Sequence, residues 1–362
     1  MRIGFVIGQT YAGGMERQLA YLCYSLAQRG HEVFVYTVSG NNRTPGREKV
    51  DISDKIIYPL YFTKYTKYFS TFYFKLLIQK HSPDLLVAFQ VGSIELCKKM
   101  LGLNSFKFKI VGNLRGIKFS VDRELAIRYM NACKEIDGII CNSKSGYDLA
   151  KQHLNINDNS VLIRIPNIVT LGKSDQSIVV KRWKILFAGS LKDVKDPLTF
   201  IKGIMEVLKT NRNVEVTIAG GGYLEEKMKK IVADVGMQKY FNFLGFVKPE
   251  NVPYSSSHIV ISSSLREASS NSILEGLAHG CLVIGTDTGG TTELLKGTPY
   301  GKLFPVGDYL MLSKHIIEFM NLNPIQLSNA RNMAKDYING HHNINDVTNE
   351  YEKLLKEILN EE

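Results

Sequence analysis

Two glutamates lie in a segment suited to binding a phosphorylated sugar. Glu267 and Glu275 have seven residues between them in the stretch LREASSNSILEGLAHGCLVIGTDTGG, residues 265–290. On a single helix this spacing would place both carboxylates near one face, about 12 Å apart along the axis. The serine-rich cluster at residues 269–272 is typical of a helix N-cap, so we predict that the helix begins between the two acids. Backbone N–H groups at that point bind anions, and carboxylates accept hydrogen bonds from hydroxyl groups.

Two glycine-rich turns would allow the backbone to approach a ligand closely. Gly13 and Gly14 stand between the predicted strand RIGFVIG and a helix, and Gly220 and Gly221 follow the predicted strand VEVTIA. Glycine admits close approach, and the N-terminus of the following helix favours an anion. An ordinary strand-to-helix turn has the same pattern, so that alternative stays open. The second turn lacks a complete G-x-G-x-x-G with a spaced acid, which disfavours a nicotinamide site.

A third loop, FAGSLKDVKDP, places lysines before a helix that Pro197 is expected to begin. Lys192 and Lys195 lie in this loop, and a lysine beside a helix N-terminus suits a diphosphate as a point charge. A solvated loop lysine is the alternative for each.

The elements that must position these residues alternate between strand and helix along the whole chain. This alternation predicts an α/β protein with two doubly wound parallel sheets. We expect Rossmann-like domains at residues 1–167 and 183–344, joined by a polar linker at residues 168–182. Ligand sites would lie at the carboxyl ends of the strands, and the domains would face each other across a cleft. The periodicity of residues 345–362 predicts a final amphipathic helix.

The charge of the chain is unevenly distributed. Of 362 residues, positions 1–165 hold 23 Lys and Arg against 13 Asp and Glu, whereas positions 166–362 hold 22 of each. No nucleic-acid motif accompanies the basic half, so the anionic leaflet of a membrane or a lipid phosphate fits better. The five scattered cysteines, the absence of a long apolar run and the lack of a signal peptide predict a cytoplasmic protein, possibly peripheral on the inner face of the membrane.

The stretch YPLYFTKYTKYFSTFYFKLLIQKH interleaves aromatic residues with lysines at positions 58–81. A helix on a membrane surface has this composition, with rings at headgroup depth and lysines toward anionic lipid. An aromatic helix packed on the first sheet would look similar, and both interpretations stay open.

Four segments together resemble glycosyltransferase family 4, which comprises retaining enzymes of the GT-B fold. YAGGMERQLAYLCYSLAQRGHEVFVYT is similar to the family's opening, and IPN at residues 165–167 to its segment before the linker. GSLKDVKDPLTFIKG is similar to the phosphate-binding loop and helix of the family. The segment REASSNSILEGLAHGCLVIGTDTGGTTELL matches its E-x7-E block and the glycine pair that follows.

The resemblance implies a role for each matching residue. Glu275 would bind the ribose of the donor nucleotide, Glu267 would contact the donor sugar, and Lys195 would neutralise the leaving diphosphate. Lys195 and Glu267 would therefore act in the catalytic step, while Gly14 would lie against the phosphates. The nucleotide would bind mainly to the C-terminal domain, the acceptor to the N-terminal domain, and the last helix would pack back on the first domain. The implied donor-binding set is Gly13, Gly14, Ser190, Lys195, Gly220, Gly221, Arg266, Glu267, Ser270, Asn271, Ser272, Ile273 and Glu275.

The chain departs from the family pattern at two functional positions. Ser190 stands where the family usually has an arginine that pairs with the lysine, so Lys192 or Arg266 would have to supply that charge. The segment NLRGIKF has Arg115 where many members carry a histidine near the acceptor. Arg115 would bind an acidic acceptor or a lipid phosphate, or else be a solvated surface arginine.

These features predict a retaining glycosyltransferase of the hexosyl- or N-acetylhexosaminyltransferase type. It would transfer a sugar from a UDP- or GDP-sugar to a glycan or lipid-linked acceptor, probably in surface polysaccharide synthesis, with no metal and no cofactor besides the donor. The alternatives are a catalytically silent GT-B relative that binds nucleotide or glycan as a scaffold, and a sugar-nucleotide epimerase.

Overall fold

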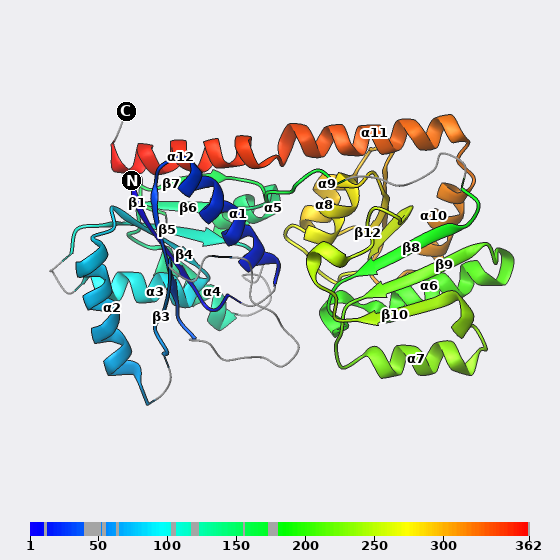
Figure 1. Cartoon of the computed structure of the whole chain (residues 1–362), viewed down its shortest axis with the longest axis horizontal. Coiled ribbons are helices and arrows are strands. Elements are labelled where there is room, and N and C mark those ends of the chain that lie inside the picture. The colour runs from blue at the N-terminus through cyan, green and yellow to red at the C-terminus, as the bar shows by residue number, and fades with distance from the viewer. Residues whose placement is uncertain are drawn as a thin grey trace. The chain divides into compact units, whose positions relative to one another are not determined.

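A computed structural model describes residues 1–10, 13–39, 52, 56–62, 65–102, 106–116, 123–154, 156–172 and 180–360. The chain divides into two compact units (Figure 1). The first comprises Met1–Ile168 together with Ile344–Glu362, and the second comprises Val169–Asn343. Tyr11 and Ala12 of the YAGG motif, residues 117–119 of the NLRGIKF segment, and residues 173–179 of the predicted linker lie outside the described residues.

A parallel sheet of seven strands forms the centre of the first unit as far as the structure describes it, in the order β3-β2-β1-β4-β5-β6-β7. Every pairing in this sheet is parallel. The strands are β1 (Arg2–Ile7), β2 (Glu32–Thr37), β3 (Ile57–Pro59), β4 (Leu85–Phe89), β5 (Lys109–Leu114), β6 (Gly138–Cys141) and β7 (Val161–Arg164).

Apolar side chains cover both faces of this sheet because successive strand residues point to opposite sides. Phe5 belongs to a core shared with the first and last helices, whereas its neighbour Val6 belongs to a second core on the other face. The helices are α1 (Gly14–Gln28), α2 (Lys67–His81), α3 (Val91–Leu101), α4 (Arg123–Cys133), α5 (Lys144–His153) and α12 (Ile344–Leu359).

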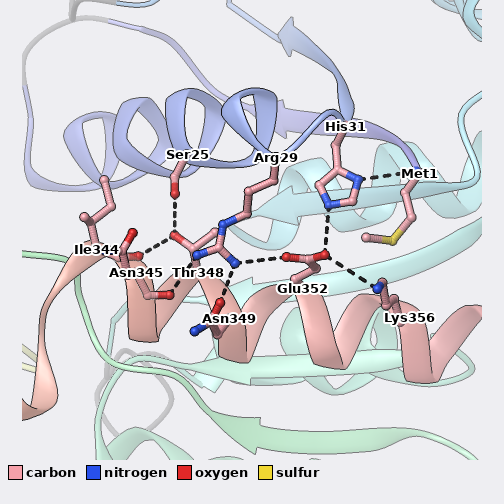
Figure 2. A network of polar contacts seen from close by, with 10 residues as sticks. All are labelled: Met1, Ser25, Arg29, His31, Ile344, Asn345, Thr348, Asn349, Glu352 and Lys356. Atoms are coloured by element: carbon pink, nitrogen blue, oxygen red, sulfur yellow. Dashed lines mark hydrogen bonds and ion pairs between the residues drawn. The ribbon is translucent and has the colours of Figure 1, made fainter. Parts of the chain in front are cut away.

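Helix α12 returns to the first unit and docks on α1 (Figure 2). Val347, Tyr351 and Leu355 are buried in the core that also contains α1. At the rim, Arg29 donates hydrogen bonds to Glu352 at 2.9 Å and to the backbone carbonyl of Asn345 at 3.0 Å. The hydrogen bond from Arg29 lowers the pKa of the Glu352 carboxyl, and His31 and Lys356 act in the same direction. The end of the chain is therefore an integral part of the first unit.

The second unit contains, within the residues described, a sheet of six parallel strands in the order β10-β9-β8-β11-β12-β13. The strands are β8 (Trp183–Ala188), β9 (Val214–Ala219), β10 (Phe241–Gly245), β11 (Ile259–Ser262), β12 (Leu282–Thr286) and β13 (Gly301–Phe304). The helices are α6 (Pro197–Thr210), α7 (Glu225–Asp234), α8 (Asn271–Ala278), α9 (Gly289–Leu295), α10 (Tyr309–Met320) and α11 (Pro324–His341).

Both sheets are doubly wound and have a point where the strand order reverses. In the second unit the chain runs from β8 outward through β9 to β10, and then returns to place β11 on the other side of β8. The loops that follow β8 and β11 therefore diverge from neighbouring strands at one edge. Such switch points are where open α/β sheets bind ligands.

The boundary between the units lies at the very start of the segment expected to be a linker. Ile168 is buried in the first unit, where its backbone N–H donates to Gln18 Oε1 at 2.6 Å. Val169 is buried in the second unit, where its N–H donates to the carbonyl of His342 at 2.9 Å. Neither residue is the solvated linker residue that the polar composition of 168–182 predicts, because the local run Ile168–Val169 is itself apolar.

All five cysteines lie among the described residues, and each is a buried free thiol. No helix in the described part of the chain is long and apolar enough to cross a membrane.

Candidate active site

Lys195 and Glu267 meet at the switch point of the second unit. Lys195 Nζ forms an ion pair with Glu267 Oε2, although the two residues are 72 positions apart in sequence. The two side chains keep 28% and 17% of their surface exposed, so a ligand can reach both. Ser264 Oγ also lies 3.3 Å from Glu267 Oε2. A cation and a carboxylate thus stand together, half-buried, where the strand order reverses.

The loop after β8 holds Lys195 rigidly because it ends in a capped helix. Asp196 is the N-cap of α6, and its side chain accepts a hydrogen bond from the backbone N–H of Thr199 at 3.2 Å. Pro197 is the first residue of α6, as the sequence predicts. Lys195 itself closes a short 3-10 turn over Asp193–Lys195. The direction of the lysine is therefore set by helix capping immediately beside it.

The loop after β11 is tied to the loop after β8 by main-chain and serine hydrogen bonds. Ser263 Oγ donates to the carbonyls of Lys195 at 3.0 Å and Asp196 at 2.7 Å. The N–H of Leu265 donates to the carbonyl of Val194 at 3.0 Å. These bonds hold the two loops in one register. Sequence reasoning missed Ser263 because a lone serine after a strand carries no signal of the loop it will contact.

The glycine pair of the E-x7-E segment fixes Glu267 from the other side. Gly290 N–H donates to the carbonyl of Glu267 at 3.0 Å. A Cβ on Gly290 would lie 1.7 Å from the carbonyl oxygen of Ala268, so no larger residue fits. The start of α9 therefore packs directly against the backbone that carries Glu267.

Helix α8 begins at Asn271, between the two glutamates, which confirms the predicted start. Its N-cap Ser270 makes no side-chain cap to the helix, and Ser270 Oγ lies 3.1 Å from Ser272 Oγ instead. Glu275 follows about one turn further along α8 and is half-buried. Ile273 is fully buried in the core of the second unit, so any donor contact it makes must come from its backbone.

His258 holds together the two strands from which these loops emerge. Its Nδ1 accepts a hydrogen bond from the backbone N–H of Lys184 at 2.9 Å, and the ring packs edge-on against Trp183. Burial lowers the pKa of His258 to about 4, with Arg331 and Lys184 adding to the effect. The sequence predicts a satisfied core histidine here, and the hydrogen bond confirms it.

Two further cations accompany Lys195 in these loops. Lys192 and Arg266 are exposed, and neither side chain forms a hydrogen bond or ion pair with any residue that the structure describes. Ser190 is half-buried, and its carbonyl accepts a hydrogen bond from the N–H of Lys192 at 3.0 Å. The loops thus carry two uncommitted positive charges beside the serine that stands where the family usually has arginine.

The glycine turn at residues 220–222 serves loop packing. Gly220 has φ +151°, and a Cβ there would lie 1.8 Å from the carbonyl oxygen of Gly189. A Cβ on Gly222 would lie 2.3 Å from the carbonyl oxygen of Leu191. Both glycines are therefore needed for the close contact between the loops after β9 and β8. Gly221 has no such conflict and is the member of the turn that can turn toward a ligand.

In the first unit, Gly13 and Gly14 begin α1 as expected, but an acid occupies the same place. Gly13 is the N-cap of α1, and a Cβ there would lie 2.2 Å from Glu16 Oε2. Glu16 is buried in the first turn, where a carboxylate is favoured by the helix dipole. Gly13 is therefore required by the position of Glu16, a constraint the sequence did not suggest.

Arg115 lies just beyond β5 at the carboxyl edge of the first sheet. Its Nη1 donates to Asn167 Oδ1 at 2.7 Å and its Nη2 to Tyr351 OH at 2.9 Å. Nε donates to Asn113 Oδ1 at 3.0 Å. The guanidinium carbon lies 5.3 Å from the centroid of the Phe89 ring, within cation–π range. The alternative of a solvated surface arginine is therefore wrong.

The partners of Arg115 are neutral and buried. Asn113 and Tyr351 are fully buried and share a hydrogen bond of 2.8 Å, and Asn167 is 3% exposed. Among the residues described, Arg115 pairs with no carboxylate. A fixed guanidinium whose charge is not neutralised by an acid is a suitable receptor for an anion. Sequence reasoning could not find this cluster, because Tyr351 lies 236 positions from Arg115 and only its helical spacing was visible.

No group of three or more metal-ligating side chains occurs among the described residues.

Solved structures share this architecture over essentially the whole chain. A sucrose-phosphate synthase from Thermosynechococcus elongatus matches 99% of this chain and 100% of its own, with a TM-score of 0.79 at 14% identity. Anabaena HepE in complex with UDP matches 99% of this chain and 100% of its own, with a TM-score of 0.77 at 16% identity. The two Rossmann-like units define the GT-B fold.

Family models match the two parts of the chain in turn. The model described as Glycosyltransferase Family 4 matches residues 12–172, and the model described as Glycosyl transferases group 1 matches residues 172–339. The chain belongs to glycosyltransferase family 4, and it is a glycosyltransferase.

Two named relatives show the range of similarity. The GalNAc-alpha-(1->4)-GalNAc-alpha-(1->3)-diNAcBac-PP-undecaprenol alpha-1,4-N-acetyl-D-galactosaminyltransferase of Campylobacter jejuni is 22% identical over 99% of this chain and 99% of its own length. One of the polypeptides of the phosphatidylinositol N-acetylglucosaminyltransferase of Arabidopsis thaliana is 22% identical over 88% of this chain and 74% of its own. Both names describe transfer of an N-acetylhexosamine to a lipid-linked acceptor.

Proposed function

We propose that this glycosyltransferase transfers a sugar, of the hexosyl or N-acetylhexosaminyl type, from a UDP- or GDP-sugar to a lipid-linked acceptor with retention at the anomeric carbon. The observation that carries the proposal is the Lys195–Glu267 pair at the switch point of the second unit. It sets a cation beside a carboxylate at the edge where open α/β sheets bind their ligands. A nucleotide diphosphate sugar needs both, a cation for its phosphates and an acceptor for its hydroxyls.

On the donor side, Lys195 faces the diphosphate and Glu267 the sugar. Glu267 accepts the hydrogen bond of Lys195 before the donor arrives and so keeps the ammonium group in place. Lys192 and Arg266 supply further positive charge where Ser190 supplies none. The N–H groups at the start of α8 bind a phosphate oxygen, and Glu275 accepts hydrogen bonds from the ribose.

On the acceptor side, Arg115 binds a phosphate of the lipid-linked acceptor. Its three hydrogen bonds to neutral partners fix the guanidinium while leaving its charge for the ligand. The names of the relatives support this class of acceptor, since one contains undecaprenol diphosphate and another phosphatidylinositol.

The reaction breaks the bond between the anomeric carbon and the diphosphate oxygen and forms a bond to an acceptor hydroxyl on the same face. Negative charge develops on the leaving diphosphate, and this diphosphate accepts the proton of the hydroxyl. Fixed donors at that charge lower the barrier, and electrostatic stabilisation of this kind is usually the largest contribution. Surface polysaccharide assembly on the membrane face is the process that uses such a product.

A donor panel tests the proposal. The protein is incubated with UDP- and GDP-sugars, and release of nucleotide is followed with and without a polyprenyl-diphosphate-linked saccharide. Release that requires one donor and the lipid-linked acceptor, and that is lost in Glu275→Ala, supports transfer. Tight donor binding with no release for any acceptor would instead indicate a binding scaffold, and interconversion of free nucleotide sugars an epimerase.

A further inference from the structure

Helix α2 exposes a continuous stripe of aromatic and aliphatic side chains (Figure 1). The exposed fractions are 92% for Tyr65, 88% for Tyr68, 71% for Phe69, 59% for Phe72 and 44% for Leu76. These residues recur at intervals of three and four positions, so they line one side of the helix and of the turn before it. Scattered single apolar residues are normal on a protein surface, but a contiguous stripe marks a binding surface.

The opposite side of α2 already provides the packing that the fold needs. Phe74, Leu77 and Ile78 are buried in the core of the first unit, and the Phe74 ring packs edge-on against Tyr36 at 5.1 Å between centroids. His81 Nδ1 and Tyr36 OH lie 2.9 Å apart. The interpretation of an aromatic helix packed on the first sheet is therefore confirmed for this side, while the exposed side is left without a partner in the fold. A helix that is apolar all round needs a second apolar environment.

The charge around the stripe is positive only. From Lys55 to Pro83 the chain contains five lysines and neither aspartate nor glutamate. Lys75 and Lys80 lie on α2 itself, and Lys99 of α3 reaches Thr71 of α2, with Nζ 3.4 Å from its Oγ1. Lysines flanking aromatic rings match the headgroup region of an anionic bilayer, where rings sit at the interface and ammonium groups contact lipid phosphate.

This local concentration is a better guide than the charge of the whole half. The residues after 343 belong to the first unit and hold six acids and two lysines, so they cancel part of its excess. The segment around α2 keeps its full positive charge, because none of those acids lies within it.

We infer that the exposed face of α2, formed by Tyr65, Tyr68, Phe69, Phe72 and Leu76, docks on an anionic phospholipid surface. The inference rests on the proposed function in one respect, since a lipid-linked acceptor places the substrate at such a surface. The stripe itself is independent of the donor and acceptor sites, so its binding can be measured without either substrate.

The test is sedimentation of the full chain with vesicles of phosphatidylcholine, alone or mixed with phosphatidylglycerol. Binding to the mixed vesicles that weakens with salt is expected, because the lysines contribute through screened charge. Phe69→Ser combined with Phe72→Ser should lower the partition coefficient by about tenfold or more, since two rings lose their apolar environment. No binding to the mixed vesicles, or unchanged binding of the double variant, would overturn the inference.

The second unit offers a matched control. Ile325 and Met333 on α11 are 73% and 50% exposed, so Ile325→Ser combined with Met333→Ser removes a similar apolar surface from another helix. This variant should bind vesicles as the unchanged protein does. If instead the α2 variant abolishes self-association in the absence of lipid, the stripe is an interface with a second copy, and the lipid proposal is wrong.

Fluorescence gives a readout of insertion that a folding defect cannot imitate. The single tryptophan of the chain, Trp183, is buried in the second unit. In a Trp183→Phe background, Phe72→Trp should shift its emission to the blue on mixed vesicles and be quenched by brominated lipid. The α2 variant should also retain transfer to a short, water-soluble acceptor. Vesicle binding without any transfer would count against the proposed function alone, and transfer without vesicle binding against this inference alone.

Discussion

The carboxyl edges of the two sheets carry their positive charge in opposite ways. In the second unit, Lys195 is paired with the carboxylate of Glu267 at the switch point. In the first unit, Arg115 is held by Asn113, Asn167 and Tyr351, all neutral. A compensated cation can exchange its partner for a phosphate during a reaction, whereas an uncompensated one attracts an anion that remains bound. We interpret the first arrangement as suited to a leaving group and the second to a substrate that stays charged.

The largest expected effect is the loss of turnover in Lys195→Ala. Removal of one preorganised donor to the developing charge should lower kcat about 100- to 1,000-fold, with a smaller change in the KM of the donor. Initial rates over a range of donor concentrations give both constants. Lys192→Ala is the control and should lose less than about tenfold, because it is an exposed helper charge. Equal losses in both variants would contradict the special position of Lys195.

The second effect is a pH dependence confined to the second unit. His258 is neutral in the folded protein because its pKa is about 4, whereas the unfolded chain takes up a proton near pH 6.5. The unfolded state therefore binds more protons between these values, and stability falls as the pH drops below about 6.5. The free energy of unfolding should decrease by about 2–3 kcal/mol between pH 7 and pH 4.5 from this group.

Trp183 allows this pH effect to be measured directly. It packs against His258 with 5.5 Å between ring centroids, so urea denaturation followed by its fluorescence reports on this part of the second unit. His258→Asn keeps an acceptor for the N–H of Lys184 and removes the titrating group. The steeper loss of stability in the unchanged protein than in this variant is the expected result, and parallel pH profiles would refute it.

A third, smaller effect separates the acceptor from the donor. Arg115→Gln should raise the KM of a diphosphate-linked acceptor about 10- to 50-fold while leaving the KM of the donor nearly unchanged, since it removes a charge-assisted contact. Tyr351→Phe removes one hydrogen bond to the guanidinium and should cost only a few-fold. Steady-state kinetics with each substrate varied in turn distinguishes the two. A change in donor KM of the same size would place Arg115 in the donor site instead.

The smallest effect is expected at Ser190. Ser190→Arg restores the cation that the family usually has, but Lys192 and Arg266 already lie uncommitted in the adjoining loops, with no side-chain partner among the residues described. The KM of the donor should fall by no more than about threefold, with kcat retained. Loss of activity would show that the serine itself is required, and a large gain would show that the other cations do not fill its role.

The sequence by itself determined the fold class and the local geometry of the site. Alternating apolar runs and helical periodicity indicated two parallel sheets, because both faces of such strands are buried. The serine cluster located the start of α8 between Glu267 and Glu275, and Pro197 located the start of α6, since caps and proline act on their immediate neighbours. The E-x7-E block carried the resemblance to the family for the same local reason.

Only the tertiary structure decided which distant residues meet. The strand order puts β11 beside β8, and this alone brings Glu267 to Lys195 across 72 positions. The return of α12 to the first unit likewise brings Tyr351 to Arg115 across 236 positions. Nothing in the spacing of such residues encodes their contact, because it results from the burial of whole strands and helices. Local chemistry is therefore legible in the chain, while the pairing of charges at each edge is a property of the packed sheets.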